Sequence, residues 1–514
     1  MNPGTLLIRA DASIAIGTGH VMRCLALAQA WQDAGGTAIA VMTESTSAIE
    51  NRLRGEGIEV LQVDGPAGSE ADAQKTASLA LERDSSWVVV DGYRFNSAYQ
   101  VTLKEAGLRI LLVDDGVHAD YYAADLVLNQ NPTASAELYA RRAPHTRLLL
   151  GTSYAMLRRQ FVIRRDWHRE IAMEGRKVLV TMGGSDPDNF TSRVLESLEA
   201  SDVSFETVVV IGGSNPHADQ MESEANARGH NSIRVMKNVS NMPELMMWAD
   251  VAVSAAGTTC WEICFLGLPA LLVDLAENQV PVARSLDSMG VARHLGSSQG
   301  CVPAMIEYEL KRLAASAEDR RRMCLRGREV VDGMGASRVC AIMLDKVLRL
   351  RSACESDCYL LWEWANEAAV RASSFSQQSI GREEHDKWFR ARLADTGCTI
   401  LIAENEEGRP VGQVRFDVRP GESAEIDVSV GPDFRGCGYG GTLINMAAGR
   451  MFATTRISRL DAFIRVENLP SIRAFERAGF RRVGEIQVRG QAAFHYRRER
   501  QRSPDIGRSA THVK

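Results

Sequence analysis

The stretch RADASIAIGTGHVMRCLALAQA, residues 9–30, decides the fold of the first part of this chain. The apolar run at 5–8 is typical of a buried parallel strand, and apolar residues then recur at helical spacing from Val21 to Ala28. Between them, the glycine turn GTGH places His20 at a helix start. Free amides at such a start attract anions, and an imidazole beside them can take a proton from water near neutral pH. The stretch therefore predicts a site for an anionic ligand.

Short apolar strands alternate with helices up to about residue 350, which is the rhythm of parallel α/β architecture. The first series of predicted strands is 6–9, 37–42, 87–91, 110–114 and 126–129. A second series follows at 177–182, 207–212, 233–236, 251–254 and 270–274. We therefore predict two Rossmann-like domains, at 1–157 and 158–350, that face each other across a cleft.

The pattern changes after Cys358 to a helix with Trp362 and Trp364, followed by strand pairs at 399–404 and 412–418. This predicts an independent α+β domain at 355–500 and a flexible polar tail at 501–514.

The charged segment 158–176 is expected to connect the two Rossmann-like domains. The Arg-rich helical stretch 310–351 is expected to close the second of them.

Net charge and the length of the apolar segments indicate which partners and which location to expect for this protein. The net charge of −5 over 514 residues gives no reason to expect binding to nucleic acid or to an anionic membrane. The start of the chain has no signal-peptide pattern and no segment is long enough to span a bilayer, so we expect a cytoplasmic protein.

The ten cysteines are scattered, and the close pairs Cys260/Cys264 and Cys354/Cys358 each have three intervening residues. This spacing is neither that of a zinc ribbon nor that of a redox pair. Reduced thiols and metal-independent chemistry are the expectation.

The opening motif, from Arg9 through Gly17-Thr18-Gly19-His20 to Leu25, closely resembles the start of the UDP-sugar hydrolases of pseudaminic-acid synthesis and of related spore-coat polysaccharide proteins. The resemblance covers about residues 5–345. It implies that His20 is the base that activates water, against the alternative of a structural histidine. The residues it assigns to substrate binding here are Gly17, Gly19 and Arg23.

Tyr93 follows a predicted strand, and by resemblance it lines the sugar pocket as a catalytic residue; packing across the cleft is the alternative. Asp114 and Asp115 also follow a strand, and a structural role in the loop is favoured for both.

The glycine turns of the second half resemble the donor-nucleotide half of the two-domain GT-B glycosyltransferase fold. The resemblance implies that Gly183, Gly184, Gly257 and Thr258 bind the substrate, and that amides near Gly257 hold its diphosphate. Glu262 is expected to accept bonds from ribose hydroxyls, unless it is a solvated helix residue. Asn278 either faces the sugar or phosphate or caps the next helix.

In the third domain, strand 425–430 leads into Arg435-x-x-Gly438-x-Gly440, and Glu467–Ser471 and Ala478–Phe480 follow downstream. This combination resembles the GNAT acetyltransferases and implies acetyl-CoA as cosubstrate, with a pyrophosphate held by backbone amides. The expected cofactor-binding residues are Val430, Arg435, Gly436, Gly438, Gly440, Gly441 and Asn468. For Asn468 the alternative is a helix cap through Ser471.

Glu425 is the candidate base that takes a proton from the substrate amine, with a cross-strand salt bridge as the alternative reading. Phe475 stands where many relatives carry a tyrosine that protonates the leaving thiolate, so that role falls to water, Tyr496 or Ser471. The segment 384–389 resembles the acceptor side of sugar-amine acetyltransferases. Its His385 is expected to be solvated or to cap a helix.

Together these features predict a bifunctional enzyme of pseudaminic acid biosynthesis that binds a UDP-linked amino sugar and acetyl-CoA. It would acetylate N4 of the UDP-amino sugar and hydrolyse UDP-2,4-diacetamido-2,4,6-trideoxy-β-L-altropyranose to free sugar and UDP. The alternatives are a glycosyltransferase fused to an acetyltransferase, a hydrolase fused to a non-catalytic acetyl-CoA sensor, and an acetyltransferase that acts on protein N-termini.

Overall fold

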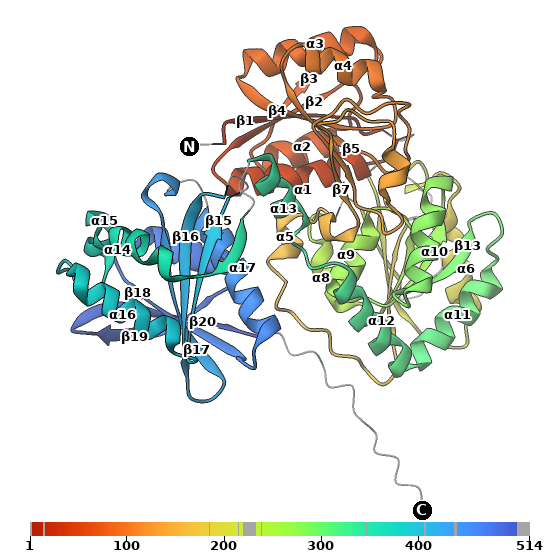
Figure 1. The fold of residues 1–514 in the computed structure, drawn as a ribbon. Coiled ribbons are helices and arrows are strands. Elements are labelled where there is room, and N and C mark those ends of the chain that lie inside the picture. The colour runs from red at the N-terminus through yellow and green to blue at the C-terminus, as the bar shows by residue number, and fades with distance from the viewer. Residues whose placement is uncertain are drawn as a thin grey trace, which may run out of the picture. The chain divides into compact units, whose positions relative to one another are not determined.

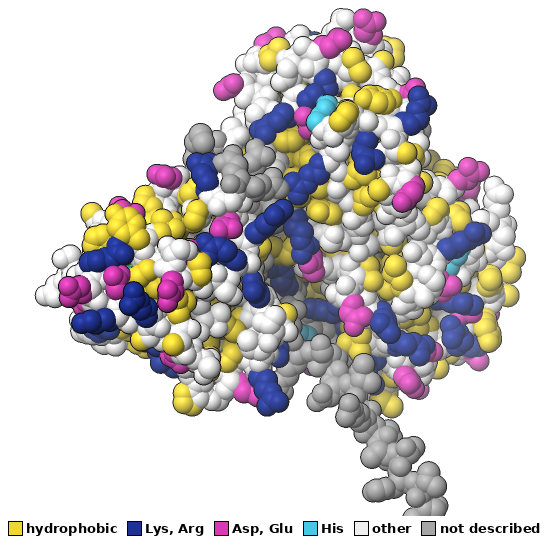
Figure 2. Space-filling model, in the orientation of Figure 1, with side chains coloured by type: hydrophobic (Ala, Val, Ile, Leu, Met, Phe, Trp, Pro, Cys, Tyr) yellow, Lys and Arg dark blue, Asp and Glu magenta, His cyan; other side chains and the backbone are white. Residues whose placement is uncertain are grey.

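The computed structural model describes residues 3–13, 16–184, 186–213, 215–218, 221, 233–237, 239–344, 348–405, 408–435 and 439–500. The chain forms two compact units, one ending at Met343 and the other beginning at Leu344. Basic and acidic side chains are both spread over the face shown in Figure 2, between areas of apolar surface. No helix in the described ranges combines the length and hydrophobicity needed to cross a bilayer.

The first lobe is a doubly wound parallel sheet with strand order β3-β2-β1-β4-β5-β6-β7, drawn in red to orange in Figure 1. Its strands are β1 (Thr5–Ala10), β2 (Thr37–Met42), β3 (Glu59–Gln62), β4 (Ser85–Asp91), β5 (Arg109–Val113), β6 (Leu126–Asn129) and β7 (Arg147–Leu150). Its helices are α1 (Gly19–Asp33), α2 (Ser47–Gly55), α3 (Glu70–Glu82), α4 (Ser97–Glu105), the 3-10 turns η1 (Ala136–Tyr139) and η2 (Thr152–Tyr154), and α5 (Arg159–Val162). Because the central strands are covered on both faces, they read as continuous apolar runs.

The second lobe repeats this topology with strand order β10-β9-β8-β11-β12-β13, all parallel. Its strands are β8 (Lys177–Thr181), β9 (Glu206–Ile211), β10 (Ile233–Lys237), β11 (Val251–Ala255), β12 (Ala270–Asp274) and β13 (Ala292–Ser297). Its helices are α6 (Phe190–Ala200), α8 (Met242–Trp248), α9 (Thr259–Leu266), η3 (Glu277–Gln279), α10 (Val280–Ser288), α11 (Pro303–Ala315) and α12 (Ala317–Val330). One apolar core lies under α8, α9 and α10 and a second under α6 and α11. The predicted pair of Rossmann-like domains is confirmed.

The chain returns to the first lobe after α12, which differs from the expectation that 310–351 closes the second lobe. Helix α13 (Gly335–Met343) packs against α1, and the carbonyl of Met343 accepts a bond of 2.9 Å from the indole of Trp87 in β4. A Cβ on Gly335 would lie 2.1 Å from the carbonyl oxygen of Ala155, so only glycine permits this approach. Sequence periodicity identified the helix, but the lobe that it contacts depends on the tertiary fold.

The third domain is a mixed sheet with strand order β14-β15-β16-β17-β18-β20-β19, drawn in blue in Figure 1. Its strands are β14 (Arg349–Ser352), β15 (Cys398–Glu404), β16 (Pro410–Arg419), β17 (Ser423–Val430), β18 (Arg459–Arg465), β19 (Arg481–Val488) and β20 (Gln491–Glu499). Its helices are η4 (Glu355–Asp357), α14 (Cys358–Asn366), α15 (Ala368–Ser373), α16 (Arg382–Ala394), η5 (Pro432–Phe434), α17 (Tyr439–Thr454) and α18 (Leu469–Arg477). The predicted α+β fold is confirmed, and the structure adds β14 to it, before the expected start at 355.

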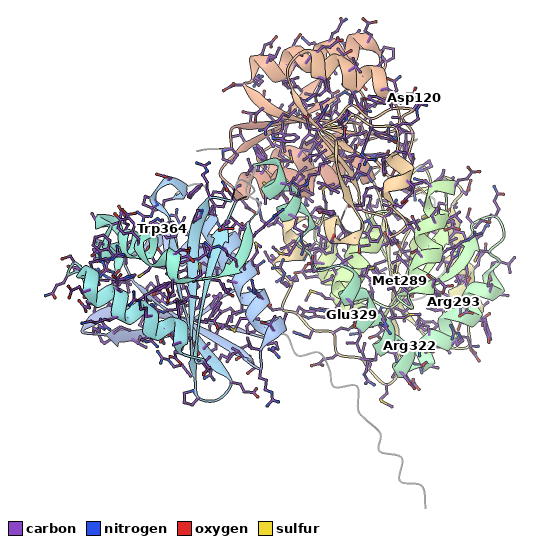
Figure 3. All side chains as sticks on the ribbon, viewed as in Figure 1. Asp120, Met289, Arg293, Arg322, Glu329 and Trp364 are labelled. Carbon is purple, nitrogen blue, oxygen red and sulfur yellow. The ribbon has the colours of Figure 1, made fainter. Side chains whose placement is uncertain are left out.

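The two faces of this third sheet differ. The face under α17 and α18 is an apolar core. On the other face α14 and α16 cover a smaller cluster that includes Trp364, labelled in Figure 3, and Phe389. Beyond that cluster the face carries charged residues of β16, β17 and β18, among them Arg415, Asp427 and Asp461. The third sheet therefore has one apolar face and one face that is partly charged.

Candidate active sites

The first site lies at the carboxyl ends of β1, β4 and β5, at the point where the strand order of the first lobe reverses. Helix α1 begins at Gly19, which puts His20 in its first turn. Asp91 is the last residue of β4 and is fully buried. His20 Nδ1 lies 2.7 Å from Asp91 Oδ1. An ionised carboxylate only accepts, so Nδ1 carries a proton, and in the neutral form of the ring Nε2 carries the free lone pair.

Arg23 ensures that Asp91 stays ionised. Its guanidinium donates two bonds of 2.6 Å to the Asp91 carboxylate and one of 2.7 Å to Asp115. Burial by itself would raise the pKa of Asp91, but Arg23 and His20 outweigh it and hold that pKa well below its usual range. Arg23, predicted to bind substrate, is 4% exposed and is held by these two carboxylates. Its direct contact with substrate stays a prediction.

Tyr93 lies beside His20 with the ring planes nearly perpendicular and the centroids 5.1 Å apart. It is 46% exposed, and its hydroxyl accepts a bond of 2.7 Å from the side-chain amide of Asn278, in η3 of the second lobe. Partial burial and the charge of Asp115 raise the pKa of Tyr93, so its hydroxyl stays protonated. Of the predicted residues, His20, Tyr93 and Asn278 therefore meet at one place, contributed by both lobes.

A second histidine, which the sequence analysis did not single out, lies on the far side of Tyr93. The ring centroids of His118 and Tyr93 are 5.9 Å apart, and His118 Nδ1 lies 3.1 Å from Asp114 Oδ1. Asp114 also accepts bonds of 2.9 Å from the amides of Gly116 and Val117, which is the structural role expected for it. The signal that could have found His118 is its position in the loop after β5, next to the loop that carries Tyr93.

Predicted glycines of each lobe lie close to a threonine of the other lobe. A Cβ on Gly184 would be 2.8 Å from Thr18 Oγ1, and one on Gly19 would be 3.4 Å from Thr258 Oγ1. Gly17 and Gly183 have φ angles of 78° and 79°, which side chains rarely adopt. Gly17 and Gly183 need glycine for their backbone conformation, and Gly184 needs it for the close approach to Thr18. Substrate binding by the predicted glycines and by Thr258 stays a prediction.

Glu262 lies on α9, one turn beyond Thr258, and is 14% exposed. It pairs at 2.7 Å with Arg158, from the segment that connects the lobes. Gly257 precedes the same helix, and a Cβ on it would lie 4.0 Å from Gln279 Nε2, an ordinary contact. The carboxylate expected to bind ribose is therefore engaged by an arginine in this structure.

The second candidate site is an opening in the third sheet. Strands β17 and β18 pair in parallel only from Ser423 to Glu425, opposite Arg459 to Asp461. Both strands continue past this point, β17 to Val430 and β18 to Arg465, without further pairing between them. The backbone of β17 from 426 to 430 is thus left unpaired on that side, as an extended ligand would require.

Several predicted cofactor residues lie near this opening. Arg435 donates to the carbonyl of Val430 at 3.0 Å and pairs with Glu367. Gly440 and Gly441 begin α17, where a Cβ would lie 3.4 and 3.6 Å from the nearest atoms of α18. Gly436 and Gly438 lie outside the described residues.

Asn468 caps α18, because its side chain accepts from the amide of Ser471 at 3.2 Å. The structural alternative for this residue is therefore present, and its contact with cofactor stays a prediction. Phe475 is 4% exposed and packs against Phe480 with the centroids 5.0 Å apart. The Tyr496 hydroxyl donates a bond of 2.8 Å to Glu476. Burial and, as the next largest cause, the Glu476 carboxylate raise the pKa of Tyr496 to about 12.

Glu425 lies where β17 and β18 part, in register with Asp461. It accepts a bond of 2.8 Å from Arg419, so the salt bridge named as its alternative is present, and its role as base stays a prediction. Asp461 is 2.7 Å from His495 and 2.8 Å from Arg497 on the neighbouring β20. Burial raises the pKa of Asp461, but Arg497 and His495 outweigh it and lower that pKa overall. No local pattern indicates the Asp461–His495 pair, because its members are 34 residues apart in sequence.

Comparison with known proteins identifies domains in both units. The model of the acetyltransferase (GNAT) domain matches residues 348–481, and that of the glycosyltransferase family 28 C-terminal domain matches residues 178–323. The chain is a fusion of a hydrolase-related unit and a GNAT acetyltransferase domain. We refer to the parts as the hydrolase-related unit and the acetyltransferase domain.

Three relatives cover different parts of the chain. An uncharacterized protein of Methanocaldococcus jannaschii is 24% identical over 93% of this chain and 97% of its own length, so it shares both parts. The UDP-2,4-diacetamido-2,4,6-trideoxy-beta-L-altropyranose hydrolase of Campylobacter jejuni is 24% identical over 55% of this chain and 97% of its own length. The spore coat polysaccharide biosynthesis protein SpsG of Bacillus subtilis is 28% identical over 39% of this chain and 59% of its own length.

Among solved structures, the spermidine N-acetyltransferase of Vibrio cholerae in complex with CoA and spermine matches 30% of this chain and 95% of its own. Its identity is 21% and its TM-score is 0.28.

Proposed function

We propose that the hydrolase-related unit hydrolyses UDP-2,4-diacetamido-2,4,6-trideoxy-β-L-altropyranose to UDP and the free sugar. The observation that carries this proposal is the His20–Asp91 pair, which holds the His20 ring next to Tyr93, the residue that bonds Asn278 of the other lobe. The hydrolase of Campylobacter jejuni named for this reaction aligns over nearly its whole length with this unit.

In the proposed reaction, His20 Nε2 takes a proton from water and the resulting hydroxide attacks the anomeric carbon of the sugar. The bond between that carbon and the diphosphate oxygen breaks, and UDP leaves with the electron pair. Asp91 stabilises the imidazolium that forms, as a buried carboxylate does for a histidine base. Attack from the face opposite the leaving group inverts the anomeric configuration. No metal ion is required, because UDP is already a good leaving group.

The second lobe would hold UDP. Amides at the start of α9, near Gly257, would offset the charge that develops on the departing diphosphate. Glu262 would accept from the ribose hydroxyls once its bond to Arg158 opens, which would release a cation next to the bound nucleotide. Asn278 and Tyr93 would orient the sugar or the attacking water.

We propose that the acetyltransferase domain acetylates the 4-amino group of the UDP-sugar precursor from acetyl-CoA. The unpaired edge of β17 would bind the pantetheine arm, and the polar face near Glu425 would bind the ammonium group. Glu425 would take the proton, and the neutral amine would attack the thioester carbon. The carbon–sulfur bond breaks, the nitrogen loses its second proton as the acetamide forms, and water relays that proton to the CoA thiolate. Both reactions act on soluble sugar nucleotides, and we place them in the cytoplasm.

The test uses the full chain with UDP-4-amino-4,6-dideoxy-N-acetyl-β-L-altrosamine, with and without acetyl-CoA, followed by mass spectrometry and proton NMR. We expect N4-acetylation and then release of UDP. His20→Asn should lower kcat for UDP release by about 10²–10⁴-fold and leave acetylation intact. Gly438→Trp, chosen from the sequence motif, should abolish acetylation and leave hydrolysis of the diacetamido substrate intact.

Each alternative has its own outcome in the same experiment. Release of UDP only when a sugar acceptor is added would replace the hydrolase by a glycosyltransferase. Binding of acetyl-CoA without transfer would favour a sensor domain, for which Phe475 is the motivating residue. Transfer to peptide N-termini instead of the sugar amine would make the domain a protein acetyltransferase.

A further inference from the structure

Cys358, His385 and Asp386 form a side-chain cluster in the acetyltransferase domain that the proposed reactions do not use. Cys358 is the first residue of α14, and the other two are consecutive residues of α16, which lies beside α14 (Figure 1). The Cys358 thiol donates to Asp386 Oδ1 at 3.1 Å and lies 3.7 Å from His385 Nδ1. One sulfur, one nitrogen and one oxygen atom all lie within 4.8 Å of one another.

These separations suit a tetrahedral metal ion. With zinc–sulfur and zinc–nitrogen bonds of about 2.3 and 2.0–2.1 Å, the sulfur and nitrogen atoms of a tetrahedral site are about 3.6 Å apart. The distance between Cys358 and His385 is 3.7 Å. The sulfur–oxygen distance, 3.1 Å, is that of a hydrogen bond and needs a shift of a few tenths of an ångström. The third separation, between the His385 nitrogen and the Asp386 oxygen, is bounded only at 4.8 Å and would have to be about 3.4 Å in a tetrahedral site, so metal binding requires a movement of the Asp386 carboxylate.

The surroundings already orient the three donors. His385 is 2% exposed, and its ring lies parallel to that of Phe389 at 6.0 Å between centroids. Asp386 accepts a bond of 2.8 Å from Arg382, which is the kind of outer partner that ligating carboxylates have in metal sites. The buried position of His385 also corrects the expectation that it is solvated or caps a helix.

In the metal-free protein the proton of the Cys358 thiol lies between the sulfur and the Asp386 carboxylate. A metal ion bound here would displace that proton and offset the repulsion between thiolate and carboxylate.

We propose that Cys358, His385 and Asp386 bind one Zn²⁺ ion, with water as the fourth ligand, and that the ion links α14 to α16. Thiolate together with imidazole selects zinc over magnesium or calcium. Such an ion would hold two helices of the acetyltransferase domain together and would take no part in the hydrolysis proposed for the other unit. Cys354, which sequence spacing pairs with Cys358, is exposed and lies outside the cluster.

The test is titration of the reduced, metal-free full chain with Co²⁺, followed by competition with Zn²⁺. A cobalt–thiolate bond produces a near-ultraviolet charge-transfer band, so we expect this band to grow to a stoichiometric end point and to disappear when Zn²⁺ is added. Cys358→Ser should abolish the band, and Asp386→Asn should weaken Co²⁺ binding about tenfold or more. Cys354→Ser is the matched control and should leave the band unchanged.

Thermal unfolding gives a second measurement that does not depend on the cobalt charge-transfer band. Zn²⁺ should raise the melting temperature of the acetyltransferase domain in the wild type and in Cys354→Ser, but not in Cys358→Ser. Circular dichroism of the metal-free variants verifies that they are folded. The proposal is overturned if the wild type gives no charge-transfer band, or if Cys358→Ser retains it.

Discussion

A histidine paired with an aspartate occurs at four places in the described part of the chain. The pairs are His20–Asp91, His118–Asp114, His294–Asp274 and His495–Asp461. Only His20 was found from sequence, because it follows a glycine turn at a helix start. In every pair except His118–Asp114 the partners are 20 or more residues apart in sequence, so spacing alone could not associate them.

At the residue scale, Asp91→Asn tests the buried group of His20, Arg23 and Asp91. The exchange leaves the guanidinium short of one buried counter-charge, so we expect the free energy of unfolding of the hydrolase-related unit to fall by about 3–5 kcal/mol. UDP release should fall as well, because an amide no longer fixes the tautomer of His20. Scanning calorimetry and UDP assays measure the two effects.

Asp33→Asn is the control for that variant, since Asp33 pairs with Arg159 at a surface where its side chain is 58% exposed. We expect a change there of about 0–1 kcal/mol. Equal stability losses in Asp91→Asn and Asp33→Asn would contradict the view that Asp91 is the central buried charge.

His118 predicts a pH-dependent contribution to stability. Burial lowers its pKa, but the bond to Asp114 outweighs burial and raises that pKa overall. A histidine with a raised folded pKa stabilises fully below its ordinary value of about 6.5, and the contribution is lost as pH rises through the folded value. His118→Gln should therefore lower the melting temperature more at about pH 5.5 than at about pH 8.5.

An exposed histidine of the same lobe, His145, provides the comparison for that variant. His145→Gln should give the same small change at both pH values. A loss in His118→Gln that is independent of pH would show that its ring contributes only packing.

At the element scale, the strands missed in the two Rossmann-like lobes are β3, β7 and β13, and all three lie at sheet edges. Strand β7 (RLLL) is apolar but only four residues long. Strands β3 (EVLQ) and β13 (ARHLGS) mix apolar and polar residues, as edge strands covered on fewer sides do, and this weakens the apolar pattern that identifies central strands. The same reason applies to β14, whose sequence RLRS contains a single apolar residue. Its place in the third sheet shows only in the pairing of Arg349–Ser352 with β15.

Strand β14 leads to a prediction about where the acetyltransferase domain begins. A fragment 355–500 lacks the β14–β15 ladder and the 2.7 Å bonds between Arg351 and Asp357, and it exposes the edge of β15. Each lost hydrogen bond costs about 0.5–1.5 kcal/mol, so this fragment should be less stable and more prone to aggregate than 344–500. Urea unfolding and light scattering compare the two fragments. Equal stability would mean that β14 is dispensable.

At the scale of the whole molecule, one hydrogen bond joins the two lobes at the first site. Tyr93→Phe removes the hydroxyl and keeps the ring on His20, and Asn278→Ala removes its partner. A double-mutant cycle in kcat/KM should give a coupling of about 0.5–1.5 kcal/mol, because neither single variant leaves the bond in place.

The control cycle replaces Asn278→Ala with Glu277→Ala, an exposed neighbour in η3. Effects in that cycle should add. Additive effects in the Tyr93–Asn278 cycle would mean that the two residues act on the substrate separately.

The sequence by itself determined two α/β lobes and an α+β domain, and it predicted a site in each unit, since buried parallel strands, glycine turns and helix starts are local features with local patterns. It named His20, Tyr93 and Asn278, and it named the glycine loop of the acetyltransferase domain. Only the tertiary structure decided that Asp91 orients His20, that α13 returns to the first lobe and that Cys358 meets His385 and Asp386. The physical reason is that strand order and helix packing bring together side chains from distant parts of the chain, and no local pattern records which ones meet.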